Sequence, residues 1–331
     1  MLCMDKCNFL LPIIADGTDK SSPLKNRIRK NYRHVRKWAK RSETNCFRIY
    51  DRDIKEYPLA IDYYDGHFLV HHFTTAREND QPPPELVDNI VKILQSIFNA
   101  APSSIHWRTR KKREKITQYE KLDETKDFFV VYEYGVKFWV NLLNYLDTGL
   151  FLDHRETRQL VASLSEGKRL LNLFAYTCSF SIHAAHAGAT FTKSVDMSNT
   201  YTAWGRENFI LNSISLKNNE IVRADCLKFL DEEISSRIKY DIIVIDPPTL
   251  SRSKKMDAIF DVQEDYATLI SKALKLLLPD GVIFFSTNSR KFVFDKTLFP
   301  SCSINEISNK TLPLDFHDKK IHRCWKIKLN F

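Results

Sequence analysis

The sequence predicts an α/β protein in which a doubly wound sheet, with helices on both faces, follows a small α+β domain. After Gly149, short apolar segments alternate with segments long enough for crossover helices, which is typical of a parallel sheet. Before Gly149, short β-like runs accompany two helical segments, and 331 residues exceed one typical domain. We therefore expect an N-terminal extension over residues 1–22, a basic α+β domain over 23–145 and the sheet domain over 146–331.

The segment Leu24–Arg41 is expected to form the first helix. Its apolar residues recur at spacings of three and four, which places Leu24, Ile28, Tyr32, Val35 and Trp38 on one face. The other faces carry nine cations and no acid: Lys25, Arg27, Arg29, Lys30, Arg33, Arg36, Lys37, Lys40 and Arg41. Like charges four residues apart destabilise a helix unless a partner neutralises them. This pattern favours an RNA-facing helix over an ordinary solvated one, with candidate RNA ligands Arg27, Arg29, Lys30 and Arg33.

Strands and a second helix complete the first domain. The expected strands are Cys46–Tyr50, Leu59–Tyr64, His67–Phe73, Ser104–Trp107, Phe128–Glu133 and Val136–Leu142, with a helix over Pro84–Phe98. Between these strands lies a second basic cluster, in which cations could hold phosphates and an aromatic ring could stack on a base. Its candidate RNA ligands are Arg108, Arg110, Lys111, Lys112, Arg113 and Tyr119. A flexible solvated loop is an equally supported interpretation.

The composition narrows the class of protein. The balance of 50 Lys+Arg against 41 Asp+Glu gives a net charge of +9, which suits a polyanionic partner. The seven cysteines include no C-x-x-C pair, which argues against a zinc ribbon or a disulfide framework and fits a reducing cytoplasm. The apolar stretch Cys7–Ala15 is too short to span a bilayer and is broken by Pro12. We interpret it as an extension or a docking segment.

The sheet domain contains the features expected of a cofactor site. The expected strands are Arg169–Phe174, Thr190–Val195, Glu220–Arg223, Tyr240–Ile245 and Val282–Ser286. The first leads into Asn172–Ser179, a turn of small residues that opens a helix, as a nucleotide-like cofactor requires. This turn is not G-x-G-x-x-G, so a dinucleotide pyrophosphate is disfavoured.

Carboxylates follow the next two strands. Asp196 ends the second strand, where a carboxylate is expected to accept both hydroxyls of a ribose. Asp225 and Cys226 follow the third, where a side-chain acceptor and a backbone amide could read an adenine edge. An adenosine cofactor without a pyrophosphate indicates S-adenosylmethionine. Both aspartates could instead be helix N-caps.

The loop Asp246-Pro247-Pro248-Thr249 follows the buried strand Tyr240–Ile245, at the edge of the sheet where ligands bind. Two prolines restrict φ and remove two N–H donors, leaving carbonyls and a carboxylate to face a planar group that carries N–H donors. The loop is thus the candidate substrate site, although a Pro-Pro loop that merely ends a strand would look the same.

Five stretches of the sequence resemble the RlmK family of large-subunit rRNA guanine-N7 methyltransferases, which in many bacteria form the C-terminal half of a fused two-enzyme protein. These stretches are residues 26–31, 146–155, 172–179, 195–198 and 246–256, and the resemblance runs from about Leu24 to Ile327. It implies a Rossmann-like class I S-adenosylmethionine-dependent methyltransferase fold, with a mixed seven-stranded sheet behind a small RNA-binding domain.

The resemblance also implies roles for residues. By motif position, the cofactor set is Asp153, Arg155, Asn172, Phe174, Tyr176, Thr177, Ser179, Asp196, Met197, Asp225, Cys226 and Asp246. Within it, Asp153 and Arg155 are expected to close the cofactor pocket from the side of the first domain. Asp246, Pro247, Pro248 and Thr249 are expected to bind the target base, with Lys254 as a further RNA ligand.

Two departures from the family pattern affect these expectations. Cys178 stands where the family turn normally has glycine, and a side chain there would cost about 1–2 kcal/mol if φ is positive. The partner methyltransferase half and its RNA-binding module are not part of this sequence. RNA capture is therefore expected from the basic helix and loop, or from a separate methyltransferase that corresponds to that half.

Guanine N7 carries a free lone pair, so its methylation requires no general base, and the enzyme can work mainly by positioning. Asp246 is expected to accept hydrogen bonds from the guanine Watson–Crick edge, while Phe260, Phe292 or Phe294 stacks on a flipped base. Cytosine-C5 methylation is the nearest rival, but it needs a cysteine nucleophile that this loop lacks. A catalytically weak RNA-binding or ribosome-assembly factor is the other alternative. The histidines His183, His186, His317 and His322, with Cys324, fit no standard zinc spacing, so we expect no metal site.

Overall fold

The chain folds into two compact units. The computed structural model describes residues 9–74, 81–111, 127–251 and 259–330. Unit 1 comprises Met1–Thr148 with Leu314–Asp318, and unit 2 comprises Gly149–Pro313 with Lys319–Phe331. The main division thus falls three residues after the expected boundary. In the described part of the chain, no helix is long and apolar enough to cross a membrane.

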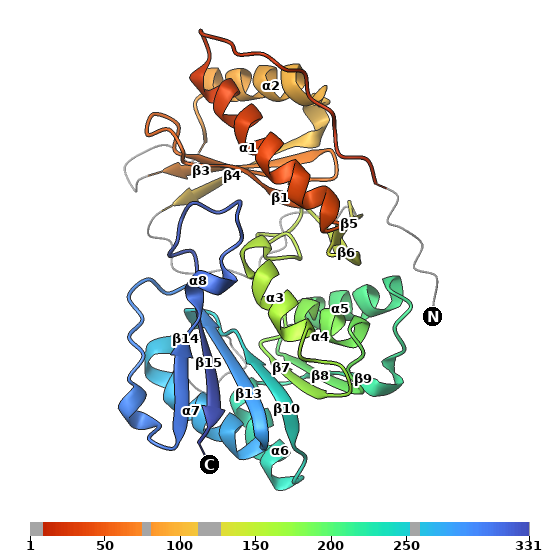
Figure 1. Ribbon diagram of the computed structural model, residues 1–331, viewed down its shortest axis with the longest axis vertical. Helices are drawn as coiled ribbons and strands as arrows, with labels where there is room; N and C mark the ends of the chain where they lie inside the picture. Colours follow the sequence, from red (N-terminus) through yellow and green to blue (C-terminus); the bar gives the residue numbers. More distant parts are fainter. Residues whose placement is uncertain (1–8, 75–80, 112–126, 252–258, 331) are drawn as a thin grey trace. The chain divides into compact units, whose positions relative to one another are not determined.

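Unit 1 is built on a four-stranded sheet in the order β1 (Cys46–Asp51), β2 (Leu59–Tyr64), β3 (His67–Thr74) and β4 (Ile105–Lys111). The first three strands are antiparallel, and β4 runs parallel to β3 after a crossover through α2 (Pro84–Phe98) and the short helix Pro102–Ser104. Helices α1 (Pro23–Arg41) and α2 cover one face of this sheet (Figure 1). A hairpin of β5 (Phe129–Glu133) and β6 (Val136–Val140) completes the unit.

Helix α1 buries the apolar face that its sequence predicts. Leu24, Ile28, Tyr32 and Val35 are buried, and Ala39 rather than Trp38 closes the face. These side chains pack against those of β1, β2, β3 and α2 in one apolar core. Burial of apolar surface contributes about 25 cal/mol per Å². The buried face therefore stabilises the helix against the repulsion between the cations on its other faces.

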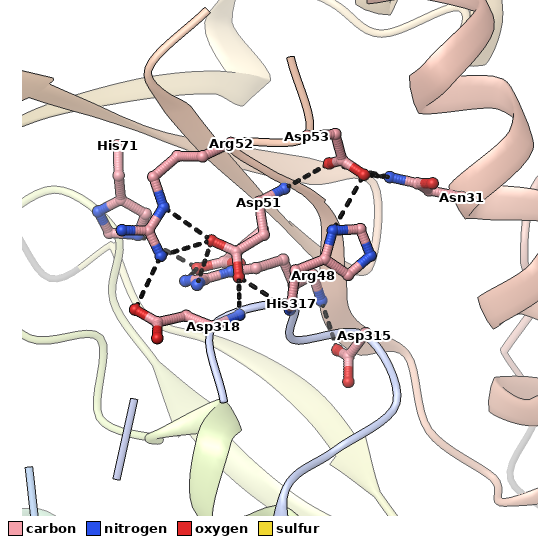
Figure 2. A network of polar contacts seen from close by, with 10 residues as sticks. Asn31, Arg48, Asp51, Arg52, Asp53, His71, Asp315, His317 and Asp318 are labelled. Atoms are coloured by element: carbon pink, nitrogen blue, oxygen red, sulfur yellow. Dashed lines mark hydrogen bonds and ion pairs between the residues drawn. The ribbon is translucent and has the colours of Figure 1, made fainter. Parts of the chain in front are cut away.

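The opposite face of the unit 1 sheet carries a polar network that holds the segment Leu314–Asp318 (Figure 2). The buried carboxylate of Asp51 accepts hydrogen bonds from the backbone N–H groups of His317 (3.0 Å) and Asp318 (3.2 Å). The backbone N–H of Arg48 donates to the Asp315 carboxylate at 2.8 Å. A segment distant in sequence is therefore attached to β1 through buried carboxylates.

The guanidinium of Arg48 lies at the centre of this network. It donates to Asp62 at 2.7 and 3.1 Å and to Asp51 at 3.4 Å. Burial alone would raise the pKa of Asp62, but Arg48 and His71 more than offset burial and hold the pKa of this carboxyl below its usual range. The contribution of this ion pair to stability is therefore complete above about pH 4, and it is lost as the pH falls through the depressed pKa.

Unit 2 is built on a mixed seven-stranded sheet in the order β14-β15-β13-β10-β7-β8-β9. The parallel strands are β7 (Arg169–Leu173), β8 (Phe191–Asp196), β9 (Asn219–Arg223), β10 (Tyr240–Ile245) and β13 (Leu277–Thr287). Strands β14 (Cys302–Glu306) and β15 (Arg323–Leu329) are antiparallel additions at one edge. Two short strands, β11 (Leu250–Ser251) and β12 (Phe260–Asp261), pair with each other beside the sheet.

Helices cover both faces of this sheet (Figure 1). Helices α3 (Arg155–Ala162), α4 (Ser179–His186) and α5 (Asn199–Leu211) lie on one face, and α6 (Cys226–Ser235) and α7 (Val262–Leu276) lie on the other. Short helices span Leu152–His154, Leu216–Asn218 and Lys296–Leu298, and α8 spans Ser308–Thr311. Strand side chains alternate between the two cores, since Leu170 packs with α3 and α4 whereas Leu171 packs with α6 and α7. The predicted fold class, a doubly wound sheet with helices on both faces, is confirmed.

Candidate cofactor and substrate site

The site expected from the sequence lies at the topological switch point of the unit 2 sheet. From the central strand β7 the chain moves to β8 and β9 on one side, and then returns to β10 on the other side. Leu173 and Ile245 pair at the ends of β7 and β10, so the turn that begins at Phe174 and the loop that begins at Asp246 leave the same edge of the sheet. Open α/β sheets bind ligands at this position.

The turn after β7 has an unusual backbone. Phe174, Tyr176 and Cys178 have φ values of +57°, +50° and +64°, in the left-handed region that favours glycine. Each such residue costs about 1–2 kcal/mol unless the surroundings hold it. The N–H of Phe174 donates to Cys226 Sγ at 3.3 Å, and the N–H of Tyr176 donates to Asp196 Oδ2 at 2.9 Å. The positive φ anticipated for Cys178 is therefore present, and the turn is stabilised by Asp196 at the end of β8 and by Cys226 at the start of the helix that follows β9.

The carboxylate of Asp196 is buried next to this turn. It accepts hydrogen bonds from the backbone N–H groups of Tyr176 (2.9 Å) and Ser198 (2.8 Å). Burial raises the pKa of Asp196 to about 6, although these hydrogen bonds oppose the shift. The N-cap of α5 is Ser198, so Asp196 is not used as a helix cap and retains lone pairs for a ligand.

Asp225 is a helix N-cap, which is the alternative that the sequence allowed. Its Oδ1 accepts from the N–H groups of Leu227 (2.9 Å) and Lys228 (3.2 Å), so this aspartate caps α6. Cys226 is buried, its pKa is raised well above the usual value by burial, and its sulfur holds the turn at Phe174. Oδ2 of Asp225 makes no hydrogen bond with any residue that the structure describes. Met197, another candidate cofactor residue, is partly buried at the start of the loop after β8.

Several other candidate cofactor residues are used for packing. Asn172 is 1% exposed and donates to Ser181 Oγ of α4 at 3.1 Å. Thr177 is fully buried and donates to the carbonyl of Gly149 at 2.6 Å, while the N–H of Gly149 donates to the hydroxyl oxygen of Tyr176 at 2.8 Å. Ser179 is the first residue of α4. These contacts position the turn against the chain that precedes the short helix Leu152–His154.

The Asp246 loop holds a carboxylate that is partly open to solvent. Oδ1 of Asp246 accepts from Ser286 Oγ at 2.6 Å, and Oδ2 lies 3.5 Å from His154 Nε2. The Asp246 side chain is 23% exposed. Pro247 is buried and Pro248 partly buried, whereas Thr249 is exposed and donates to Asn288 Oδ1 at 2.7 Å. Ser286 thus orients one oxygen of Asp246 and leaves the other with only a long contact.

His154 and His322 belong to this site, and sequence reasoning missed both roles. His154 Nε2 lies 3.8 Å from Asp153 Oδ2, and that same carboxylate oxygen lies 3.3 Å from His322 Nδ1. The two imidazole rings stack with centroids 4.5 Å apart. Burial lowers the pKa of His154, although the carboxylates of Asp246 and Asp153 oppose this shift. Burial would raise the pKa of Asp153, but His154 and His322 hold it below the usual range.

One atom from each of Asp153, His154 and His322 lies within 4.8 Å of the others, a separation that would also suit a metal ion. However, His322 already contacts Asp153 through Nδ1 and Thr311 Oγ1 through Nε2 (3.1 Å). Because the two rings are stacked, their in-plane lone pairs do not converge on one point, as binding of a single metal ion would require. Hydrogen bonds to Asp153 and Thr311 therefore account for the position of His322. Arg155, expected to close the cofactor pocket with Asp153, is completely buried.

Of the aromatic residues proposed to stack on a base, Phe260 and Phe292 are 3% and 2% exposed and belong to the apolar core. Their rings are therefore not available to a base in this structure, which corrects that expectation. Phe294 is partly buried and packs against Tyr266 and Trp325.

The candidate RNA ligands of unit 1 separate into several groups. Arg108 is 9% exposed and donates to the carbonyls of Leu142 and Leu146, so the expectation that it contacts RNA is not supported. Arg29 and Arg33 donate to carbonyls of residues 15–17, while Arg27 is partly buried and Lys30 is exposed. Lys112, Arg113, Tyr119 and Lys254, and the side chains of Arg110 and Lys111, lie outside the described residues.

Comparisons with known proteins agree with this architecture. The family model described as "S-adenosylmethionine-dependent methyltransferase" matches residues 53–322. The chain is 44% identical over 310 residues to the ribosomal RNA large subunit methyltransferase K of Neisseria meningitidis serogroup B, which covers 93% of this chain and 87% of that protein. It is 43% identical over 323 residues to the ribosomal RNA large subunit methyltransferase K/L of Shewanella sp. (strain MR-4), which covers 96% of this chain and 45% of that protein. The chain thus spans about half the length of that K/L relative.

Solved structures show the same fold. The structure of SMU.776 complexed with SAH matches with a TM-score of 0.71 at 24% identity, over 94% of this chain and 83% of that one. The S-adenosylmethionine-dependent methyltransferase from Agrobacterium tumefaciens matches with a TM-score of 0.57 at 19% identity, over 82% and 87% of the two chains. The resemblance to RlmK and the cofactor expected from it, S-adenosylmethionine, are confirmed. The chain belongs to the S-adenosylmethionine-dependent methyltransferase family, among relatives named ribosomal RNA large subunit methyltransferases K and K/L.

Proposed function

We propose that this protein transfers a methyl group from S-adenosylmethionine to N7 of a guanosine in large-subunit (23S) ribosomal RNA, in the cytoplasm. The names of the relatives support rRNA as the substrate. The observation that carries the choice of guanine is the geometry of Asp246. Ser286 fixes one carboxylate oxygen at 2.6 Å, while the other has only a contact of 3.5 Å to His154 and can accept new hydrogen bonds.

Guanine is the RNA base that presents two adjacent donors, N1–H and N2–H₂, on its Watson–Crick edge. A carboxylate can accept from both, and charge-assisted hydrogen bonds of this kind are about twice as strong as neutral ones. Pro247 and Pro248 add no N–H donors that would compete for the Asp246 carboxylate. We infer that the loop holds the guanine by this edge, with N7 on the opposite side directed toward the methyl donor.

The chemistry needs positioning more than proton transfer. S-adenosylmethionine supplies a methyl group activated by a sulfonium, and the N7 lone pair requires no deprotonation before it reacts. The residues of this chain would then fix the base relative to the cofactor, an effect that can contribute several kcal/mol to the barrier. We assign the turn at Phe174–Ser179 to the cofactor backbone, Asp196 to the ribose, and Asp225 with the Cys226 amide to the adenine.

The cysteines weigh against cytosine-C5 methylation. That reaction needs a thiolate that adds to the ring. Cys178, Cys226 and Cys324 are buried, and burial raises the pKa of the Cys178 thiol to about 12. Among the described residues, none of these thiols lies on the Asp246 loop. N7 is therefore the better supported methyl acceptor.

The positive φ of Cys178 favours one second candidate, an RNA-binding factor with weak cofactor affinity. Calorimetric titration of the purified protein with S-adenosylmethionine separates the two functions. Binding in the micromolar range supports the enzyme. Absence of binding both in the parent and in Cys178→Gly would favour the second candidate.

Asp246→Ala tests the assignment directly. We expect a fall in the methylation rate of unmodified large-subunit rRNA of about 100-fold, since a loss of two charge-assisted hydrogen bonds corresponds to about 3 kcal/mol. Affinity for S-adenosylmethionine should change less than threefold. Asp241→Ala is the matched control, because Asp241 lies at the other end of β10, where it holds Lys168 and the N–H of Arg169. An unchanged rate in Asp246→Ala, or a product other than 7-methylguanosine in nucleoside mass spectrometry, would contradict the proposal.

A further inference from the structure

The N-terminal segment of the described chain covers part of the cationic surface of α1. Residues 11–17 run back along the helix, in the opposite direction to it (Figure 1). The hydroxyl of Tyr32 donates to the Pro12 carbonyl at 2.8 Å, and Arg33 donates to the Ala15 carbonyl at 2.7 Å. Arg36 and Arg29 donate to the carbonyls of residues 11 and 17 at 3.3 and 3.4 Å. Peptide carbonyls thus occupy the guanidinium groups along this side of the helix.

Two acidic residues complete this arrangement. Asp16 Oδ1 lies 2.8 Å from Arg33, and Asp19 Oδ2 lies 3.5 Å from Lys25. Four of the nine cations of α1, namely Lys25, Arg29, Arg33 and Arg36, therefore have partners in residues 11–19. We call them the occupied cations.

A second set of cations remains exposed. Lys30, Lys37, Lys40 and Arg41 are exposed, and so is His34 between them. None of these five side chains makes a hydrogen bond or an ion pair with the residues that the structure describes. Lys30, His34, Lys37 and Arg41 follow one another at spacings of four, three and four, which aligns them on one side of the helix. We call these residues, with Lys40, the free stripe.

The free stripe has no acid to balance it, because α1 contains none. Lys40 and Arg41 lie in the last turn, where they interact favourably with the helix dipole. This does not explain Lys30 and Lys37, which lie further from the end and repel their neighbours. With a rise of 1.5 Å per residue, cations three or four residues apart are separated by about 5 Å along the helix, so they can contact successive phosphates of one nucleic-acid strand.

We propose that the free stripe binds the phosphodiester backbone of the RNA substrate, whereas the occupied cations hold the N-terminal segment and do not contact RNA. This inference rests on the proposed function in taking RNA as the substrate. It changes the expectation from the sequence, which assigned Arg29 and Arg33 to RNA. Lys30 is retained, and Lys37, Lys40 and Arg41 are added.

Two triple variants test the assignment, because each removes three positive charges from the same helix. The stripe variant is K30A/K37A/R41A, and the control is R29A/R33A/R36A. The affinity of the full chain for an unmodified large-subunit rRNA fragment is measured at several KCl concentrations, without cofactor. Removal of one cation that binds a phosphate reduces the slope of log K against log salt by about 0.7–0.9. We expect the slope to fall by about 2 in the stripe variant, with affinity at least tenfold weaker at about 0.1 M KCl.

The control variant should keep the parent slope to within about 0.5, and should instead expose residues 9–20 to proteolysis. The variant K30R/K37R/R41K keeps the charges, and it should restore the binding that the stripe variant loses. Equal slopes for the two alanine variants would overturn the proposal, because only net charge would then matter. A stripe variant that binds RNA normally but loses affinity for phosphatidylglycerol vesicles would overturn it too.

These measurements separate the stripe from the proposed reaction. Binding is recorded without methyl transfer, so a reduced slope in the stripe variant supports the stripe even if the product is not 7-methylguanosine. Conversely, if the protein forms 7-methylguanosine but the stripe variant keeps the parent salt slope, the proposed function stands and the proposed role of the free stripe is wrong.

Discussion

The side chain of Cys178 fills space that Gly205 leaves open. A Cβ at position 205 would lie 3.2 Å from the Cβ of Cys178 and closer still to its sulfur. Cys178 precedes α4 and Gly205 lies within α5, so the two helices approach closely at this contact. The side chain at position 178, where the resemblance to RlmK led us to expect glycine, is thus accommodated by a glycine on the neighbouring helix.

This relationship predicts coupling between the two positions. Gly205→Ala should lower the free energy of unfolding by about 1–3 kcal/mol, because the added methyl group overpacks a buried contact. In Cys178→Gly/Gly205→Ala, the methyl group takes the place of the sulfur and φ at position 178 is no longer strained, so most of this loss should be recovered. Urea denaturation of the parent, both single variants and the double variant gives the coupling energy. Additive effects of the two substitutions would contradict the contact.

Cofactor affinity should depend on pH through Asp196. Burial raises the pKa of Asp196 to about 6, so its protonated form favours the folded state. That contribution to stability is complete below about pH 4, and it is lost as the pH rises through about 6. Ribose hydroxyls donate better to the ionised carboxylate. Affinity for S-adenosylmethionine should therefore rise by up to about tenfold between pH 5 and pH 7 and then level off. Asp196→Asn should bind more weakly and show no such rise by calorimetry, and parallel curves for parent and variant would argue against this role.

We expect the imidazole of His154 to separate the carboxylates of Asp153 and Asp246. Its Nε2 atom lies 3.5 Å from Asp246 and 3.8 Å from Asp153. In His154→Ala these carboxylates face each other without the imidazole, so we expect the methylation rate to fall at least tenfold and to reach half its maximum at a higher pH. His154→Gln retains an N–H donor and should recover part of the rate.

The readout for His154 is the pH profile of the rate at saturating S-adenosylmethionine, with affinity for the cofactor as the second measurement. The matched control is His183→Asn, which changes another buried histidine of unit 2, on α4. A profile in His154→Ala that keeps the shape of the parent profile would show that His154 only fills space.

The attachment of Leu314–Asp318 to β1 should depend on Asp51. Asp51→Ala removes a buried carboxylate that accepts from Arg48, Arg52 and two backbone N–H groups, so we expect a loss of about 3–5 kcal/mol of stability. Hydrogen exchange should become faster at residues 314–318. The control is Lys272→Ala, which breaks the more exposed pair with Asp231 and should cost less than about 1 kcal/mol. Unchanged exchange at residues 314–318 would rule out this role for Asp51.

Local sequence patterns predict the regular elements well. Strand β10 and helix α2 match their expected ranges, Tyr240–Ile245 and Pro84–Phe98, residue for residue. In both cases the chain marks the boundaries itself, because Pro84 begins α2 and the Asp246 loop with its two prolines ends β10. The strand that contains Val282 instead begins at Leu277, because pairing with Tyr240 extends it beyond its apolar run.

The polar contacts were less predictable, because they join distant segments. Asp153 and His322 meet across 169 positions of sequence, so no local pattern indicates their pairing. Arg108 belongs to a run of cations that is typical of a solvated loop. In the structure it lies on strand β4, where its side chain points to one face of the sheet and donates to the carbonyls of Leu142 and Leu146. In the same way, the cations of α1 are equivalent in sequence, and only their contacts with residues 11–19 distinguish the occupied cations from the free stripe.

The inclusion of Leu314–Asp318 in unit 1 also has a consequence for the order of events during synthesis. Domains generally fold as units, N-terminal first, while the ribosome is still extending the chain. Here Asp51 accepts two of its hydrogen bonds from the backbone N–H groups of His317 and Asp318, and the N–H of Arg48 donates to Asp315, 266 or 267 positions later in the chain. The polar interior of unit 1 can therefore be completed only after residues 149–313 of unit 2, which lie between these positions in sequence, have been synthesised.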